Sequence, residues 1–227
     1  MKHQNISITT DNGTDVLAQA PIIISASRAT DIPAFYSDWV FRRLEKGYIR
    51  WRNPFSGQDS YVSFVNTRFI VFWSKNPSPL LPYLPMLEDR GIGYYIQFTL
   101  NNYEPDGLEP NVPPLAQRID TFRRLVDTLG SGGVVWRFDP LILTDKINID
   151  TLLEKIAHIA DALVGHAEKL VFSFADINTY KKVSRNLRLS GINYREWDEE
   201  SMREFALRLS TLNRDNWNLR LATCAER

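Results

Sequence analysis

Polar and charged side chains follow the ends of several hydrophobic runs in this chain. Arginine and lysine at such positions can bind an anion, carboxylates can exchange a proton, and amides or hydroxyls can orient a ligand through hydrogen bonds. The candidate site residues are Arg28, Thr30, Asp31, Asn53, Lys75, Asn76, Gln97, Arg137, Asp139, Asp176 and Glu226. This set of residue types predicts a site for a polar or anionic ligand.

Four of these residues are candidates for catalysis. They are Lys75, Asp139, Asp31 and Glu226. A buried lysine can act as a base or form a Schiff base, an exposed one can contact a phosphate, and a structural one can pair with Asp139. Carboxylates such as Asp31, Asp139 and Glu226 can act as acid and base. The alternative for Asp31 is a helix cap.

The other candidates are interpreted as ligand-binding residues, with Arg28 the most important of them. Arg137 and Asp139 lie two apart in a strand-like run, so both side chains should point to one face. They form either a ligand clamp with its orienting carboxylate or a structural ion pair. For Asp176 a helix cap or a salt bridge is favoured over ligand binding.

The elements that must position these residues form a repeated pattern. A short hydrophobic run, a polar segment and an amphipathic helical stretch follow one another several times between residues 21 and 227. This order is typical of a parallel α/β barrel, in which the loop after each strand contributes to one rim. About seven strands are expected, so we predict an incomplete TIM-like barrel as one domain over residues 21–227. Residues 1–20, with the turn sequence Asp11-Asn12-Gly13, predict a separate N-terminal β-hairpin.

Composition restricts the class of protein. The 27 Lys and Arg residues balance the 27 Asp and Glu residues, which disfavours a broad non-specific nucleic-acid surface. The single cysteine, Cys224, excludes a disulfide framework within the chain and fits a reducing, cytoplasmic setting. The three histidines lie outside the polar segments, so no metal site is predicted. No hydrophobic stretch is long enough to span a membrane.

Seven short sequence motifs resemble those of the bacterial family catalogued as domain of unknown function 1848. They are SASRATDIPAFY (25–36), RNPF (52–55), VFWSKNP (71–77), QFT (97–99), EPNVP (109–113), WRFDP (136–140) and TCAE (223–226). Members of this family carry a C-terminal cysteine cluster similar to that of radical S-adenosylmethionine enzymes. The resemblance therefore implies an iron–sulfur cluster and S-adenosylmethionine as family cofactors, but this chain ends before that segment. It is expected to be a truncated enzyme, an enzyme remnant or a member that acts without the cluster.

Three functions are compatible with the sequence. The first is an enzyme or former enzyme that binds a polar or anionic ligand at the carboxyl-end rim of the strands. The second is a non-catalytic module that binds a nucleotide or phosphate ligand. The third and weakest is a single-stranded nucleic-acid binder that uses Lys181, Lys182, Arg185, Arg188, Tyr180 and Tyr194. A second copy of the chain could cover an open barrel edge.

Overall fold

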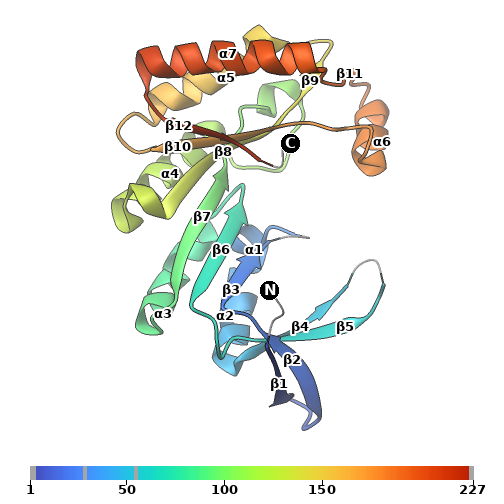
Figure 1. Ribbon diagram of the computed structural model, residues 1–227, viewed down its shortest axis with the longest axis vertical. Helices are drawn as coiled ribbons and strands as arrows, with labels where there is room; N and C mark the ends of the chain where they lie inside the picture. Colours follow the sequence, from blue (N-terminus) through green and yellow to red (C-terminus); the bar gives the residue numbers. More distant parts are fainter. Residues whose placement is uncertain (1–3, 28–29, 54–55, 225–227) are drawn as a thin grey trace. The chain divides into compact units, whose positions relative to one another are not determined.

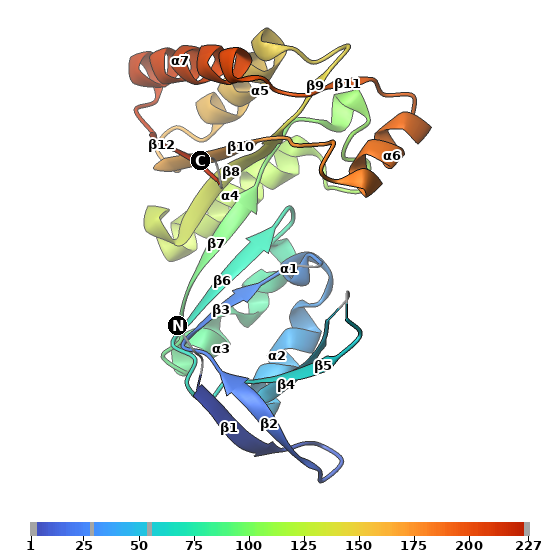
Figure 2. The ribbon, with the colours of Figure 1, turned by 45° about the vertical axis from the view of Figure 1, so that its right-hand side comes forward.

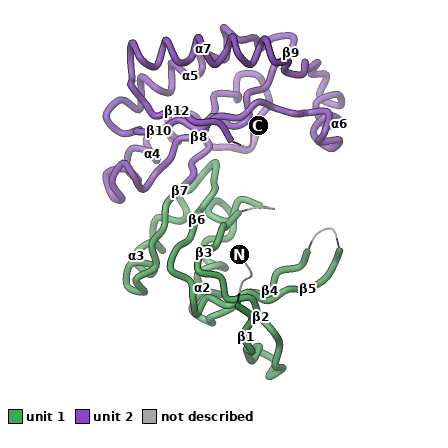
Figure 3. Tube along the Cα trace, viewed as in Figure 1, with its two compact units in different colours: residues 1–96 green, residues 97–227 purple. Residues whose placement is uncertain are grey.

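The computed structural model describes residues 4–27, 30–53 and 56–224. The chain divides into two compact units, residues 1–96 and 97–227, which are coloured separately in Figure 3. Each unit combines β-strands with helices, so the fold is mixed α/β. The predicted division into a 1–20 arm and a 21–227 domain stays a prediction.

Unit 1 begins with an antiparallel hairpin. Strand β1 (Gln4–Thr9) pairs with β2 (Asp15–Ala20), and Gly13 in the connecting turn has φ +77°. A hairpin turn of this kind favours a residue that tolerates positive φ, which explains the glycine. Strand β2 then pairs with β5 (Asp59–Ser63), and β5 pairs with β4 (Tyr48–Arg52), giving a four-stranded sheet in the order β1-β2-β5-β4.

Unit 1 also contains a pair of parallel strands that belongs to a different sheet. Strand β3 (Ile23–Ala26) pairs with β6 (Phe69–Ser74) in register Ile24↔Ile70. Side chains on one face of this pair pack against α2 (Ser37–Lys46) and α3 (Leu84–Asp89), leaving a cavity of only about 20 Å³. Helix α1 (Ile32–Phe35) and the 3₁₀ helix η1 (Ser78–Tyr83) complete this layer.

Two features of unit 1 depart from a parallel barrel. Strand β4 forms an antiparallel hairpin with β5, because residues 53–58 are too short for the crossover that parallel strands need. Strand β3 is covered on one face only, since Ile23 is 61% exposed. Alternate residues of a strand point to opposite faces, and the helices cover only one of them.

Unit 2 contains a parallel sheet with large helices. The elements are the end of β7 (Gly93–Thr99), α4 (Leu115–Leu129), β8 (Val134–Leu141), α5 (Ile149–Ala162), β10 (Lys169–Phe174), α7 (Glu199–Asn216) and β12 (Arg220–Thr223). Strand β10 lies between β8 and β12 and runs parallel to both (Figure 1). The ring of Phe98 stacks on Phe122 of α4, and Phe172 contacts Phe205 of α7, so these aromatic side chains fill the core between sheet and helices.

The connection between β10 and α7 carries the smaller elements of unit 2. Helix α6 (Lys181–Leu189) is followed by β11 (Tyr194–Arg195), which pairs antiparallel with β9 (Leu143–Thr144). Figure 2 shows α6 set apart from α5 and α7. This connection therefore consists of one short helix, a two-residue strand and loop segments.

The expected α/β fold with a parallel sheet is present, but the described residues form no closed TIM barrel. Strand β7 passes from one unit to the next, and the parallel strands follow the hydrogen-bonded order β12-β10-β8-β7-β6-β3. This order ends in two different strands, so the six-stranded sheet is open over the described residues. Closure of a TIM barrel takes eight parallel strands, and here β4 belongs to a different sheet.

Candidate functional site

The carboxyl end of β8 holds the best-defined polar pair of unit 2. Asp139 Oδ2 accepts hydrogen bonds from Nε of Arg137 at 3.0 Å and from Nη2 of the same guanidinium. The side chain of Arg137 is only 3% exposed, whereas that of Asp139 is 26% exposed. The prediction that both side chains share one face of the strand is therefore confirmed. On this face Arg137 and Asp139 form an ion pair.

Neighbouring strands complete the hydrogen bonds of this pair. Nη1 of Arg137 donates to Gln97 Oε1 of β7 at 3.3 Å, and the hydroxyl of Ser173 on β10 donates to Asp139 Oδ1. Burial by itself would lower the pKa of Arg137, but its hydrogen bonds to Asp139 and Cys224 raise the pKa above the ordinary value. Arg137 is thus a permanent cation beneath a carboxylate that faces outward.

A buried polar network fixes the backbone at Asp139. The side chain of Asn101 accepts from the Asp139 N–H at 3.0 Å and donates to the Asp139 carbonyl at 3.1 Å. The same amide donates to Glu109 Oε1 at 3.2 Å. Arg118 of α4 donates to the Asn101 carbonyl at 3.0 Å and to Glu104 Oε1. The proline-rich loop after β7 is therefore tied to the end of β8.

Arg118, Glu104 and Ser173 were not predicted as site residues. Arg118 is 1% exposed and lies on the same face of α4 as Phe122 and Leu125. A charged residue at the i and i+4 spacing of an inward helix face is a sequence signal for a buried ion pair. No comparable pattern distinguishes Ser173, because small hydroxyl residues are common in strands.

Unit 1 brings three of the predicted residues together. Asp31 Oδ1 accepts the Ala34 N–H at 3.0 Å as the N-cap of α1, and Oδ2 accepts the Lys75 N–H at 2.8 Å. Asn76 follows directly, and its N–H donates to the hydroxyl of Ser74 at 2.9 Å. The capping alternative for Asp31 is therefore observed, with an additional bond to the loop after β6.

Ser27, immediately after β3, has an unusual backbone conformation. Its φ is +88°, a region that non-glycine residues rarely adopt. Its hydroxyl accepts the Ile32 N–H at 3.0 Å and so stabilises the turn into α1. Strained backbone of this kind is frequent where a loop is shaped for function.

Other predicted residues lie elsewhere. Asn53 sits in the turn after β4, where its Oδ1 accepts the Ser56 N–H at 3.2 Å, so it belongs to the four-stranded sheet and not to the β3–β6 strand ends. Asp176 is exposed, and its carboxylate accepts hydrogen bonds from the N–H of Thr179 at 3.3 Å and from the hydroxyl of Thr179 at 2.6 Å. This is the kind of structural role that the sequence favoured for Asp176. Thr30 is exposed.

The predicted residues thus form one group in each unit. Unit 1 holds Asp31, Lys75 and Asn76, and unit 2 holds Gln97, Arg137 and Asp139. Arg28 and Glu226 lie outside the described residues. The predicted convergence of Arg28, Lys75 and Arg137 on one cavity stays a prediction.

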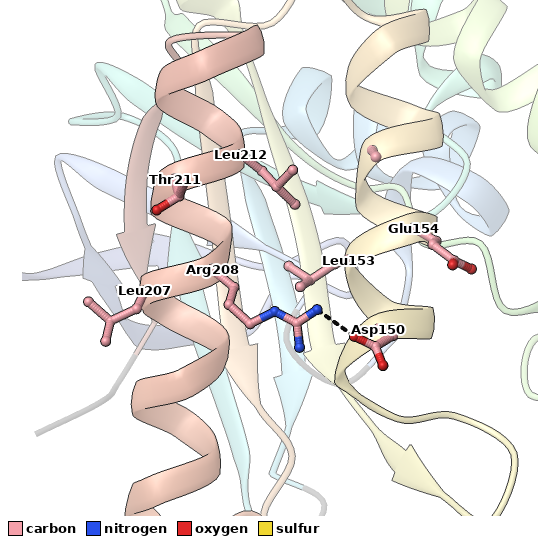
Figure 4. A pocket seen from close by; sticks show the side chains of 8 residues that line it. Asp150, Leu153, Glu154, Leu207, Arg208, Thr211 and Leu212 are labelled. Atoms are coloured by element: carbon pink, nitrogen blue, oxygen red, sulfur yellow. Dashed lines mark hydrogen bonds and ion pairs between the residues drawn. The ribbon is translucent and has the colours of Figure 1, made fainter.

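A groove of about 760 Å³ lies between α5 and α7 of unit 2. Figure 4 shows Leu153, Leu207 and Leu212 along it, with an ion pair from Arg208 to Asp150 across it. None of the predicted site residues lines this groove. It is an open apolar surface and not the polar site at the end of β8.

Few of the described residues are of a type and arrangement that could bind a metal ion or an iron–sulfur cluster. Within residues 4–27, 30–53 and 56–224, no group of three His, Cys, Asp or Glu side chains could hold a metal ion. A four-iron cluster takes about four thiolates, and the 227 residues contain one cysteine. The residues of this chain do not fit such a cluster. The described helices include none with the length and apolar character of a transmembrane segment.

The fold and the polar strand ends define an α/β protein with an open parallel sheet. A family model, Domain of unknown function (DUF1848), matches residues 23–227. The chain belongs to this family. Neither a curated protein nor a solved structure matches the chain.

Proposed function

We propose that the chain binds a small polar ligand at the carboxyl ends of β7, β8 and β10, with Asp139 as the contacting carboxylate. The observation that carries this proposal is the contrast within one ion pair. Arg137 is buried to 3% exposure, while Asp139 keeps 26% of its side chain accessible. A pair with a purely structural role has no need for an accessible carboxylate at the end of a parallel strand, where ligands of α/β sheets usually bind.

The chemistry of Asp139 defines the ligand class. Its two oxygens accept from Arg137 and from the hydroxyl of Ser173, which fix the plane of the carboxylate. An ionised carboxylate has about four acceptor positions, so it retains capacity for N–H or O–H donors of a ligand. We therefore expect a ligand that presents an amine or hydroxyl group to Asp139, with proton exchange as the simplest reaction.

We make separate proposals for the residues of unit 1 and for Glu226. Arg28 and Lys75 would contribute positive charge to an anionic ligand of unit 1, where Asp31 would contribute a carboxylate, and Glu226 would contribute a carboxylate in unit 2. Asp31 already accepts two backbone N–H groups, so an orienting role suits it better than proton transfer. The radical S-adenosylmethionine resemblance adds S-adenosylmethionine, which has an amino group and ribose hydroxyls, to the ligands worth testing.

Equilibrium dialysis against three probes tests the proposal. S-adenosylmethionine and adenosine monophosphate carry hydroxyl donors, and inorganic phosphate offers mainly acceptors. We expect binding of at least one of the first two, weakened about tenfold or more by Asp139→Asn, because a hydrogen bond to a charged group is worth about 1.5–3 kcal/mol. Asp176→Asn, which alters an exposed turn, is the matched control.

Two results would overturn the proposal. Equal affinity of wild type and Asp139→Asn for a bound probe would remove Asp139 from the site. Binding of inorganic phosphate that is unaffected or strengthened by Asp139→Asn would favour the non-catalytic phosphate-binding module. Circular dichroism of each variant ensures that the comparison concerns folded protein.

A further inference from the structure

The segment from Tyr180 to Arg195 carries the strongest local charge of the chain. It contains five cations and no Asp or Glu, although the whole chain has no net charge. The cations are Lys181, Lys182, Arg185, Arg188 and Arg195. We call residues 180–195, which comprise α6 and β11, the α6 surface.

Helix geometry arranges three of these cations in a row. Lys181, Arg185 and Arg188 are spaced i, i+4 and i+7, so they share one face of α6 over about 10 Å. Another side of the helix is used inside unit 2. There Leu187 is buried against Ala175 and Ile177. The helix is therefore anchored by its apolar side and presents a basic row to solvent.

The cations of α6 are not neutralised within the described part of the chain. Lys181, Lys182, Arg185 and Arg188 are exposed and make no ion pair there. The nearest acidic residues in the sequence are engaged locally, since Glu196 accepts the Asn178 N–H at 2.8 Å and Asp176 binds Thr179. Four full positive charges are thus available to an anionic partner.

An exposed aromatic residue lies at the N-terminal end of α6. Tyr180 directly precedes α6, and 63% of it is exposed. A second ring, Tyr194, is held in place because its hydroxyl bonds to Ser184 at 2.8 Å and to Asn178 at 2.9 Å. Cations in a row beside an exposed aromatic ring match the phosphate backbone and an unpaired base of a single strand.

We propose that the α6 surface binds single-stranded nucleic acid, independently of the ligand site at Asp139. The phosphates contact Lys181, Arg185 and Arg188, and one base stacks on Tyr180. A membrane surface fits less well, because an interfacial helix needs a continuous apolar face and α6 buries Leu187 inside unit 2.

Fluorescence anisotropy of the full chain with a short labelled oligouridylate tests this proposal. We expect binding, and the logarithm of the association constant should fall linearly with the logarithm of the salt concentration. The triple variant Lys181→Gln, Arg185→Gln, Arg188→Gln should reduce the slope by about two, since each phosphate contact on a single strand contributes about 0.7. The matched control is Arg124→Gln, Arg203→Gln, Arg214→Gln, which removes three exposed cations from α4 and α7 and should leave affinity unchanged.

The aromatic part of the proposal has its own variants. Tyr180→Ala should weaken binding about tenfold and Tyr180→Phe should not, because stacking needs the ring and not the hydroxyl. Equal loss in both triple variants would mean non-specific charge attraction and would overturn the proposal. Binding to phosphatidylserine vesicles with none to oligouridylate would also overturn it and would assign the surface to a membrane.

Discussion

Asp31 accepts a hydrogen bond from the backbone N–H of Lys75 at 2.8 Å, although 44 residues separate them in the sequence. The other carboxylate oxygen of Asp31 caps α1 through Ala34. One side chain therefore joins the loop after β3 to the loop after β6. Any ligand contact made by Lys75 or Asn76 depends on this link, because it fixes the backbone from which their side chains extend.

Removal of this link should destabilise the protein. Asp31→Ala loses a cap and a loop contact, and we expect a decrease in the free energy of unfolding of about 1–3 kcal/mol, with a smaller loss for Asp31→Asn. Urea denaturation measures the change. Asp38→Ala, which breaks an exposed i,i+4 pair with Arg42, is the control and should cost less than about 0.5 kcal/mol. Equal effects at the two positions would contradict the structural role of Asp31.

The pair Arg137–Asp139 should show strong energetic coupling. Asp139→Ala leaves the buried guanidinium without its main partner, and Arg137→Met leaves Asp139 without its cation. Breaking a buried pair typically costs about 3–5 kcal/mol, whereas removing both partners costs less than the sum. A double-mutant cycle by urea denaturation measures this coupling. Additive effects of the two substitutions would show that the pair contributes no specific interaction.

Arg118 should hold the loop between β7 and α4. Its guanidinium bonds to Glu104, to the Asn101 carbonyl and, through Nε, to the Pro113 carbonyl at 2.9 Å. We expect Arg118→Lys to destabilise almost as much as Arg118→Met, because an ammonium group cannot satisfy acceptors at three separated positions. Limited proteolysis within residues 102–113 should accelerate in both variants. Full rescue by lysine would indicate that only the charge matters.

The acid dependence of stability should include a contribution from Asp198. This residue is the N-cap of α7, and its bond from the backbone N–H of Ser201 lowers the pKa below the usual 3.8. A lowered pKa in the folded state gives stability that is present above about pH 4 and is lost as pH falls through the folded pKa. Asp198→Asn retains the cap but does not titrate.

The measurement is urea denaturation of wild type and Asp198→Asn from neutral pH to below pH 4. We expect the advantage of wild type over the variant to shrink on acidification. Asp120→Asn, at an exposed position of α4, is the control for the loss of one carboxylate. A difference that is constant over this pH range would exclude the contribution of Asp198.

Several local features were predictable from the sequence because they depend on neighbours along the chain. The alternation of Arg137 and Asp139 predicted a shared face, which is confirmed. Asp198 is of a residue type that favours N-cap positions, and it caps α7. At α5 both Asn148 and Asp150 are candidates, and Asn148 caps the helix through Thr151 at 2.9 Å. Both residue types are good caps, so local preference could not choose between positions two apart.

Tertiary structure decided which strands share a sheet and which charges are buried. The residues of β4 resemble a barrel strand, yet pairing with β5 removes them and Asn53 from the parallel sheet, which stays open. Similarly, only the packing of α4 places Arg118 beside Glu104 and Asn101. The sequence alone determined the strand and helix propensities, the faces of single elements and which polar residues lie at strand ends. Sheet order and buried ion pairs depend instead on contacts between distant residues, whose free energies arise only when the chain is folded.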